Sequence, residues 1–280
     1  MTLRRVTRAV LCAVLVAAAP GARAAVPAAP SPAPASDRLD LDYLENAARD
    51  AGAIAASPAR WGRRDWLEAG GVLGGAAVLY AGVDLDARKA VRRSRSDAAT
   101  RAAAAARSFG DGLYLVPALG AAYLGGVAAA DARLRRTALE GAEALGVSEL
   151  FVGALKLTAG RSRPYANLGR GDWNGPSSSN DRWSFPSGHT SAAFSAAAVV
   201  AAEYGDRAFV PPLAYGLAAL TGLSRVYDDK HWASDVFVGG ALGYFSARAV
   251  LRRWRGRPGR VALAPVLDGG RVGALAAVRF

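Results

Sequence analysis

Six apolar segments of helix length dominate the sequence and fix the class of fold that it can adopt. They lie at residues 66–83, 112–130, 137–157, 189–204, 208–223 and 234–251. Strands would show alternation of apolar and polar residues, which is scarce here. Most segments are about 16 to 21 residues long, which suits either a bundle helix or a membrane span. The sequence therefore predicts an all-α body with about six core helices.

The first residues have the three parts of a secretory signal peptide. A basic start at residues 1–8 is followed by an apolar stretch at 9–19 and by an A-x-A pattern at 22–24. An uncleaved anchor helix is the alternative, although the apolar stretch is shorter than the ~20 residues that a span requires. Cys12 is the one cysteine and lies in this segment. A chain cleaved near Ala25 would therefore have no thiol and no disulfide.

Beyond the predicted signal peptide, residues 1–24, the chain divides into three parts. Residues 25–60 hold an N-terminal segment that begins with an extended linker, since residues 27–36 alternate Pro, Ala and Ser. Residues 61–255 contain no such linker and are predicted to form one helical domain. Residues 256–280 hold two strand-like patterns on either side of Asp-Gly-Gly, which predicts a short C-terminal β-hairpin.

The formal net charge of +12 raises the question of a nucleic-acid partner. The arginines are spread through connecting segments, at residues 88–95, 133–136 and 252–260, and no nucleic-acid-binding motif accompanies them. Such loops are typical of solvated surfaces or of contact with anionic lipid headgroups. We expect association with an anionic membrane and no nucleic-acid partner, and the sequence does not indicate an oligomeric state.

Both histidines of the chain lie in short polar patterns. His189 ends Pro186-Ser187-Gly188-His189 at the start of a predicted helix, where backbone N–H groups would face an anion. His231 precedes Asp235 by four residues, which places both on one face of a helix. A carboxylate that accepts from one imidazole nitrogen would fix the tautomer and leave the other nitrogen free to attack phosphorus.

Three cations lie at other ends of the predicted helices. Lys156 ends one apolar segment, Arg163 follows it in a loop, and Arg225 ends another segment. Guanidinium groups hold phosphate oxygens bidentately, whereas lysine acts as a point charge. Consecutive helices of a bundle run antiparallel, so these cations and both histidines should meet at one end of it.

Together these patterns resemble the three-part signature of the type 2 phosphatidic acid phosphatase (PAP2) superfamily. The three parts are Lys156 with Arg163-Pro164, then Pro186-Ser187-Gly188-His189, then Ser224-Arg225 with His231 and Asp235, in that order and spacing. This superfamily includes bacterial class A acid phosphatases, lipid phosphate phosphatases and vanadium haloperoxidases. The resemblance covers about residues 151–251 and leaves the N-terminal third and the tail uncovered.

The resemblance implies a helical bundle of the PAP2/haloperoxidase type and a role for each matching residue. His231 would be the nucleophile that forms a phosphohistidine, Asp235 would support it, and His189 would be the general acid. The phosphate pocket would consist of Lys156, Arg163, Ser187, Gly188 and Arg225. The phosphatases of this family need no metal, and we expect neither a metal nor another cofactor here.

The predicted activity is hydrolysis of phosphate monoesters, with phosphatidate-like lipids or lipid pyrophosphates as substrates. One alternative is a non-specific periplasmic acid phosphatase that acts on small soluble esters. Two further alternatives are a vanadium-dependent haloperoxidase, which would use the same pocket, and a non-catalytic protein that binds anions. Loss of a nucleophile or a cation would favour the last of these, and none is lost.

The signal peptide predicts export to the cell envelope, with the active site facing the periplasm. If every apolar segment spanned a membrane, the basic loop at 133–136 would lie outside, against the positive-inside rule. If the segment at 66–83 only packed on the domain, the basic loops would lie inside and both histidines outside. A soluble bundle fits equally well, so the sequence leaves soluble and membrane-embedded forms open.

Overall fold

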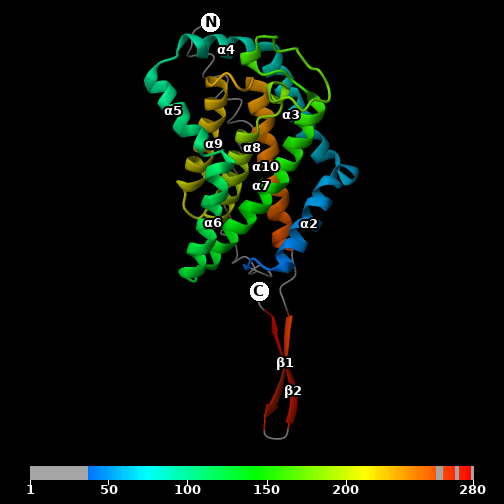
Figure 1. Ribbon diagram of the computed structural model, residues 1–280. Coiled ribbons are helices and arrows are strands. Elements are labelled where there is room, and N and C mark those ends of the chain that lie inside the picture. Colours follow the sequence, from blue (N-terminus) through cyan, green and yellow to red (C-terminus); the bar gives the residue numbers. More distant parts are fainter. Residues whose placement is uncertain (1–36, 257–260, 269–270, 279–280) are drawn as a thin grey trace.

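The computed structural model describes residues 37–256, 261–268 and 271–278. The predicted signal peptide and the linker at 27–36 lie outside the described residues. The α-helices of the described part, shown in Figure 1, are α2 (Leu41–Ala55), α3 (Arg63–Gly82), α4 (Asp84–Arg93), α5 (Asp97–Ser108), α6 (Gly112–Ala128), α7 (Ala132–Ala159), α8 (Gly188–Glu203), α9 (Val210–Tyr227) and α10 (Ala233–Gly256). Short 3₁₀ turns occur at Ser57–Arg60, Pro164–Ala166 and Asn180–Arg182.

Each of the six apolar segments forms one helix, in order α3, α6, α7, α8, α9 and α10. The predicted number of about six helices is nevertheless wrong, because the described residues form nine. The additional helices α2, α4 and α5 bury only a few side chains each and carry charged residues on their exposed faces. A search for continuous apolar segments does not find amphipathic helices of this kind.

The ends of the helices follow from local sequence. Asp111 and Asp131 cap α6 and α7, and their side chains accept hydrogen bonds from backbone N–H groups of the first turn. At the other end, α7 stops at Gly160, which has a left-handed φ of 55°. A Cβ atom there would lie 1.9 Å from the carbonyl oxygen of Gly175, so only glycine fits. Gly160 therefore sets where the loop after α7 begins, close to Lys156 in the last turn of the helix.

The centre of the bundle is α8, which packs against α7, α9 and α10. Two glycines of α10 let its backbone approach that of α8 closely. A Cβ atom at Gly239 would lie 2.4 Å from the carbonyl oxygen of Ser187. A Cβ atom at Gly243 would lie 2.0 Å from the carbonyl oxygen of Ser191. Alanines fill much of the remaining core around Phe194 and Trp254. This packing brings the start of α10 against the start of α8.

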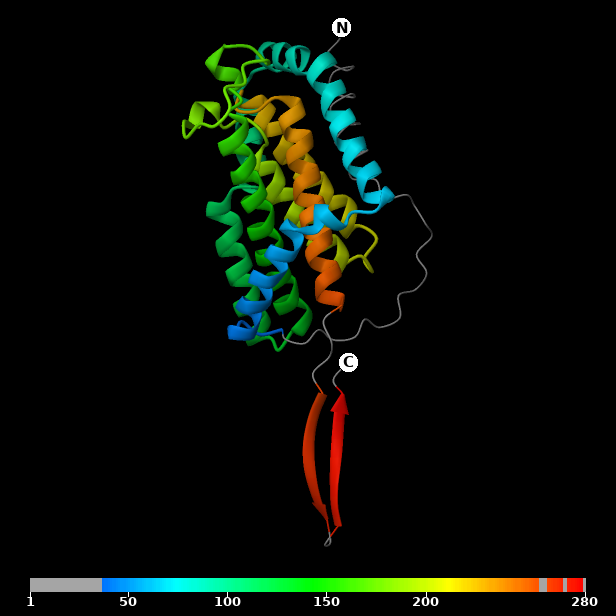
Figure 2. The same cartoon turned by 90° about the vertical axis from the view of Figure 1, so that its right-hand side faces the viewer.

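The N-terminal helix α2 packs on the outside of this bundle, as Figure 2 shows from the side. The hydroxyl of Tyr43 donates to the carbonyl oxygen of Leu139 in α7, at 3.1 Å. Arg253 of α10 forms an ion pair with the buried carboxylate of Asp50, at 2.5 Å. These contacts tie a segment that lies outside the predicted domain 61–255 to the helical body.

Two strands follow α10, β1 (Val261–Asp268) and β2 (Arg271–Val278). They pair antiparallel, with Val261 opposite Val278 and Asp268 opposite Arg271. In both ribbon views the pair extends beyond the C-terminal end of α10, at the opposite end of the molecule from the loop 160–187 (Figures 1 and 2).

Within the described part of the chain, no single helix combines the length and the apolar character that a membrane crossing needs. The helices α3 and α4 meet those criteria only when taken together across a bend of 55°. The uncharged segment at 112–130 forms α6, which is apolar but has only 17 residues.

Candidate active site

The ends of four helices bring the predicted residues together at one end of the bundle. Lys156 lies in the last turn of α7, and its Nζ would be 3.3 Å from a Cβ atom added at Gly188, the first residue of α8. The backbone N–H of Ser187 donates to the carbonyl oxygen of Asp235 in the first turn of α10, at 3.1 Å. Residues of three separate segments of the predicted site, from α7, α8 and α10, thus lie side by side.

His231 lies in the loop before α10 and is only 3% exposed. Its Nδ1 is 2.6 Å from the carbonyl oxygen of Ser184. Since a carbonyl oxygen only accepts, Nδ1 carries the proton and Nε2 keeps its lone pair. Burial, followed by the positive charges of Arg163, Lys156 and Arg225, holds the pKa of His231 well below its ordinary value. The imidazole is therefore neutral at physiological pH, with Nε2 available for attack.

The predicted direct hydrogen bond between His231 and Asp235 is not present. Helix α10 begins only at Ala233, so His231 lies before the helix and the four-residue spacing does not align the two side chains. Asp235 instead accepts from the hydroxyl of Ser184, at 2.6 Å, and from the backbone N–H of Trp232, at 2.9 Å. It therefore reaches His231 indirectly, because Ser184 contacts both residues.

Arg161 is a buried partner of Asp235 that sequence reasoning missed. The guanidinium is 1% exposed and forms ion pairs with Asp235 and with Asp84 at the start of α4, the latter at 2.8 Å. It also stacks near the rings of Trp173 and Trp232, at 4.9 and 5.5 Å from their centroids. The one sequence signal was its position two residues before Arg163, which does not distinguish a buried arginine from an exposed one.

His189, the second residue of α8, is less buried than His231, with a side chain 33% exposed. Its Nε2 lies 3.6 Å from a carboxylate oxygen of Asp111. Burial and the nearby charge of Arg225 lower the pKa of His189 to about 4, and Asp111 opposes this shift. No pattern in the sequence indicated a role for Asp111. In the structure it is the acidic neighbour of His189.

The three predicted cations are buried to different extents and held differently. Arg225 is 7% exposed; its Nη1 donates to Asp228 at 2.9 Å, while its buried Nε makes no hydrogen bond to any described residue. Arg163 donates from Nε and Nη2 to Asn180, at 2.8 and 2.9 Å. Burial and the charge of Arg163 lower the pKa of Lys156. A buried donor without a partner, such as Arg225 Nε beside other cations, is what an oxyanion site requires.

The turn at the start of α8 differs in part from expectation. The hydroxyl of Ser187 is hydrogen-bonded with Thr190, at 2.8 Å, and its backbone N–H is bound to Asp235. The N–H groups of Gly188 and His189 have no hydrogen-bond acceptor among the described residues. The helix N-terminus therefore offers two free amides, whereas Ser187 shapes the turn.

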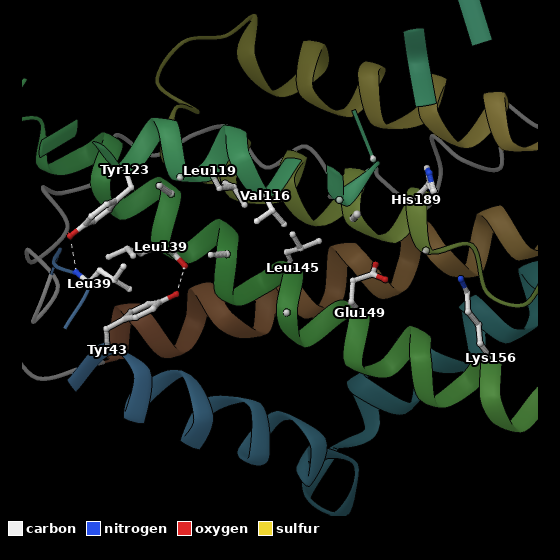
Figure 3. Close-up of a pocket in the computed structure, with 18 residues that line it drawn as sticks. Leu39, Tyr43, Val116, Leu119, Tyr123, Leu139, Leu145, Glu149, Lys156 and His189 are labelled. Atoms are coloured by element: carbon white, nitrogen blue, oxygen red, sulfur yellow. Dashed lines mark hydrogen bonds between the residues drawn. The ribbon is translucent and has the colours of Figure 1, made fainter. Parts of the chain in front are cut away.

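A long apolar groove of about 770 Å³ runs from this cluster along α6 and α7. Figure 3 shows Lys156, Glu149 and His189 at one end and Tyr123, Leu39 and Tyr43 at the other. Between the two ends its lining consists of apolar side chains and glycines, which include Val116, Leu119, Gly120, Leu145 and Gly146. A charged head and an apolar tail on one ligand would match the two parts of this groove.

No group of three or more His, Cys, Asp or Glu side chains in the described ranges is arranged to hold a metal ion. The positive charge around His231 comes from side chains of this chain, Lys156, Arg163 and Arg225.

The part of the chain that holds this cluster is similar to known proteins. The model of the PAP2 superfamily matches residues 138–258. Over 104 residues the chain is 37% identical to a lipid A 1-phosphatase of Porphyromonas gingivalis. The matched region is 36% of this chain and 20% of that protein. The chain thus spans about a fifth of that relative.

Two solved structures are also similar. The crystal structure of Aquifex aeolicus LpxE matches with a TM-score of 0.49 and 22% identity, over 61% of this chain and 96% of that one. A transmembrane PAP2-type phosphatidylglycerolphosphate phosphatase from Bacillus subtilis matches with a TM-score of 0.48 and 20% identity, over 65% of this chain and 94% of that one. The match to the PAP2 superfamily model spans residues 138–258, which contain all eight predicted site residues, and it confirms the resemblance to that superfamily.

Proposed function

We propose that this protein is a phosphatase that hydrolyses the phosphate monoesters of lipids through a phosphohistidine intermediate on His231. The observation that carries the proposal is the arrangement of the cationic cluster at one end of the apolar groove. Lys156 and His189 line that end of the groove, and the buried, neutral His231 lies near the positive charges of Arg163, Lys156 and Arg225. A phosphate dianion would neutralise this cluster and satisfy the free Nε donor of Arg225.

The reaction takes place in two steps. In the first, Nε2 of His231 forms a bond to phosphorus while the bond from phosphorus to the ester oxygen breaks, and His189 gives its proton to the departing oxygen. In the second, His189 takes a proton from water, the water oxygen bonds to phosphorus, and the bond to His231 breaks. Inorganic phosphate and an alcohol are released, and both histidines return to their starting states.

The chain's own cations stabilise the transition state of each step. Charge develops on the equatorial oxygens of the transferring phosphoryl group, where Lys156, Arg163, Arg225 and the free amides of α8 would bind. These groups are already desolvated, so they need little reorganisation as the charge develops. Because these charges belong to side chains of the chain itself, we expect activity to persist in the presence of a chelator.

The groove favours a lipid over a small soluble ester as the substrate. A soluble ester would leave the apolar length between α6 and α7 in contact with water, whereas an acyl chain would cover it and gain roughly 0.8 kcal/mol per buried methylene. The phosphate pocket itself does not distinguish these substrates, because both present the same terminal group.

We further propose that the protein is exported and works at a membrane of the cell envelope, with the active site on the periplasmic side. Large apolar side chains of α6 and α9 are exposed, among them Leu113 (74%), Leu124 (67%) and Leu213 (56%). Apolar surface of this extent fits contact with lipid. The basic loops would face anionic headgroups.

The experiment that tests the activity compares two histidine variants on two substrates. The full chain in detergent micelles receives either a single-chain lipid phosphate or p-nitrophenyl phosphate, whose leaving group needs no proton. His231→Ala should release no phosphate from either substrate. His189→Ala should still release nitrophenol once per molecule and then accumulate the phosphoenzyme. Phosphate binding without turnover by the unmodified protein, or substantial turnover by folded His231→Ala, would overturn the proposal.

A further inference from the structure

Hydrogen-bonded residues lie at the far end of the apolar groove. The backbone N–H of Leu39 donates to the hydroxyl of Tyr123, at 2.8 Å, and the hydroxyl of Tyr43 donates to the carbonyl oxygen of Leu139, at 3.1 Å. Figure 3 shows these two bonds side by side across the end of the groove. Residues of α2, α6 and α7, together with the segment just before α2, therefore form an end wall, defined here as Leu39, Tyr43 and Tyr123.

The length of the groove matches one acyl chain. On α6 its lining extends from Gly112, near His189, to Tyr123 in the end wall. Eleven residues of α-helix rise about 17 Å, at ~1.5 Å per residue. The hydrocarbon core of a bilayer is ~30 Å thick, so the groove is about as long as the acyl layer of a single leaflet.

We propose that the end wall limits the length of the acyl chain that the enzyme accepts, so that Leu39, Tyr43 and Tyr123 determine specificity. This inference rests on the proposed hydrolysis of lipid phosphates. A chain that just reaches the wall covers the whole apolar lining. A longer chain must bend out of the groove, and each excluded methylene forfeits the gain of about four-fold in kcat/KM that its burial would give.

Two glycines of the lining allow the groove to be shortened by design. Gly146 of α7 and Gly120 of α6 both line it, and no atom lies within 4 Å of where their Cβ atoms would be. A leucine at either position would therefore start from a Cβ atom in open space beside the groove, and leucine also favours helix more than glycine does. Gly146 lies seven residues from Leu139, or about 10 Å from the wall, and Gly120 lies three residues from Tyr123, or about 5 Å.

The test measures kcat/KM of the full chain for straight-chain alkyl phosphates of increasing length. The longest chain that is hydrolysed well should be shortest for Gly146→Leu, longer for Gly120→Leu, and longer again for the unmodified protein. Tyr123→Ala, which opens the wall, should accept the longest chains of all. Gly125→Leu is the matched control, because Gly125 also lies on α6 in open space but does not line the groove.

Each result has a distinct meaning. If the unmodified protein, Gly146→Leu, Gly120→Leu and Tyr123→Ala all have the same length limit and still hydrolyse the shortest esters, the role of the end wall is overturned. The proposed phosphatase activity is then unaffected. A shift in Gly125→Leu equal to that in Gly120→Leu would also overturn it, because the effect would not come from the groove. Failure of the unmodified protein to hydrolyse any ester would overturn the proposed function itself.

Discussion

The carbonyl oxygen of Ser184 lies 2.6 Å from Nδ1 of His231 and holds the imidazole in the tautomer that leaves Nε2 free. The acceptor is a backbone group, so its chemistry does not depend on the side chain at position 184. Asp235 has no direct hydrogen bond to His231 and instead accepts hydrogen bonds from the Ser184 hydroxyl and the Trp232 amide. We therefore propose that Asp235 positions His231 through Ser184, and it is also the counter-ion of Arg161.

This arrangement predicts different results for Ser184→Ala and Asp235→Asn. Ser184→Ala removes one side-chain hydrogen bond but keeps the carbonyl acceptor, so it should lower the free energy of unfolding by about 1 kcal/mol and retain most of kcat. Asp235→Asn removes a buried charge from Arg161 and should cost about 3–5 kcal/mol. Urea denaturation and kcat measured on both variants check this, and equal losses in the two would contradict it.

The pH dependence of activity should respond to Asp111. Its carboxylate raises the pKa of His189, against burial and Arg225, which together lower that pKa to about 4. The proposed mechanism needs protonated His189, so the rate should fall as pH rises through this pKa. Asp111→Asn should move the alkaline limb of the kcat/KM profile to lower pH while preserving the helix cap, because an asparagine oxygen also accepts the bond from Leu113.

The matched control for this prediction is Asp131→Asn, which changes the corresponding cap of α7 away from the histidines. Its pH profile should be the same as that of the unmodified protein. Because the chain has two histidines, two imidazole resonances in an NMR titration report both pKa values directly. An unchanged His189 titration in Asp111→Asn would contradict the prediction.

Inhibition by inorganic phosphate should depend on Arg225. Its buried Nε has no hydrogen-bond partner among the described residues, and a bound phosphate would supply one. Arg225→Lys keeps the charge but loses the fork of donors, so the inhibition constant should rise about 10- to 100-fold. Arg107→Lys should change it by less than about three-fold, because Arg107 contacts the same Asp228 at 3.5 Å but is half exposed. Equal effects of the two substitutions would exclude a direct role for Arg225.

The sequence predicted those parts of the molecule that depend on continuous patterns. Six helices follow from uniform apolar segments, and the convergence of Lys156, Gly188 and His231 follows from the antiparallel order of helices. Contacts between segments far apart in the chain could not be predicted in this way. Arg161 and Asp84 are separated by 77 residues, and Asp84 begins a charged helix that no apolar pattern indicates.

The error at His231 has a local cause. A spacing of four residues brings side chains together only when both belong to one helix, and α10 begins two residues after His231. Helix boundaries are the least certain part of a prediction from sequence. The link through Ser184 depends on the path of the loop before α8, which no residue pattern indicated.

Glu140 in α7 should make the stability of the protein fall as pH rises from about 4.5 to about 8. Glu140 is 3% exposed, and its Oε2 makes no hydrogen bond to any described residue. Burial and the neighbouring charge of Glu203 raise its pKa to about 8, although Arg136 and Arg255 oppose the shift. The charge of Glu143, on the same helix, also raises the pKa of Glu140, by less than Glu203 does.

The sign follows from the number of bound protons in each state. Between the ordinary pKa of 4.5 and about 8, the unfolded chain has lost the Glu140 proton and the folded chain keeps it. The free energy of unfolding should therefore fall as pH rises through this window, by up to ~1.4 kcal/mol per pH unit. Glu140→Gln keeps a neutral group there, so it should stabilise the protein at pH values near 8 and have little effect near pH 5. Denaturation at both pH values, with the exposed Glu45→Gln as the control, checks this. If Glu140→Gln changes the stability equally at both pH values, the carboxyl group does not titrate in this way.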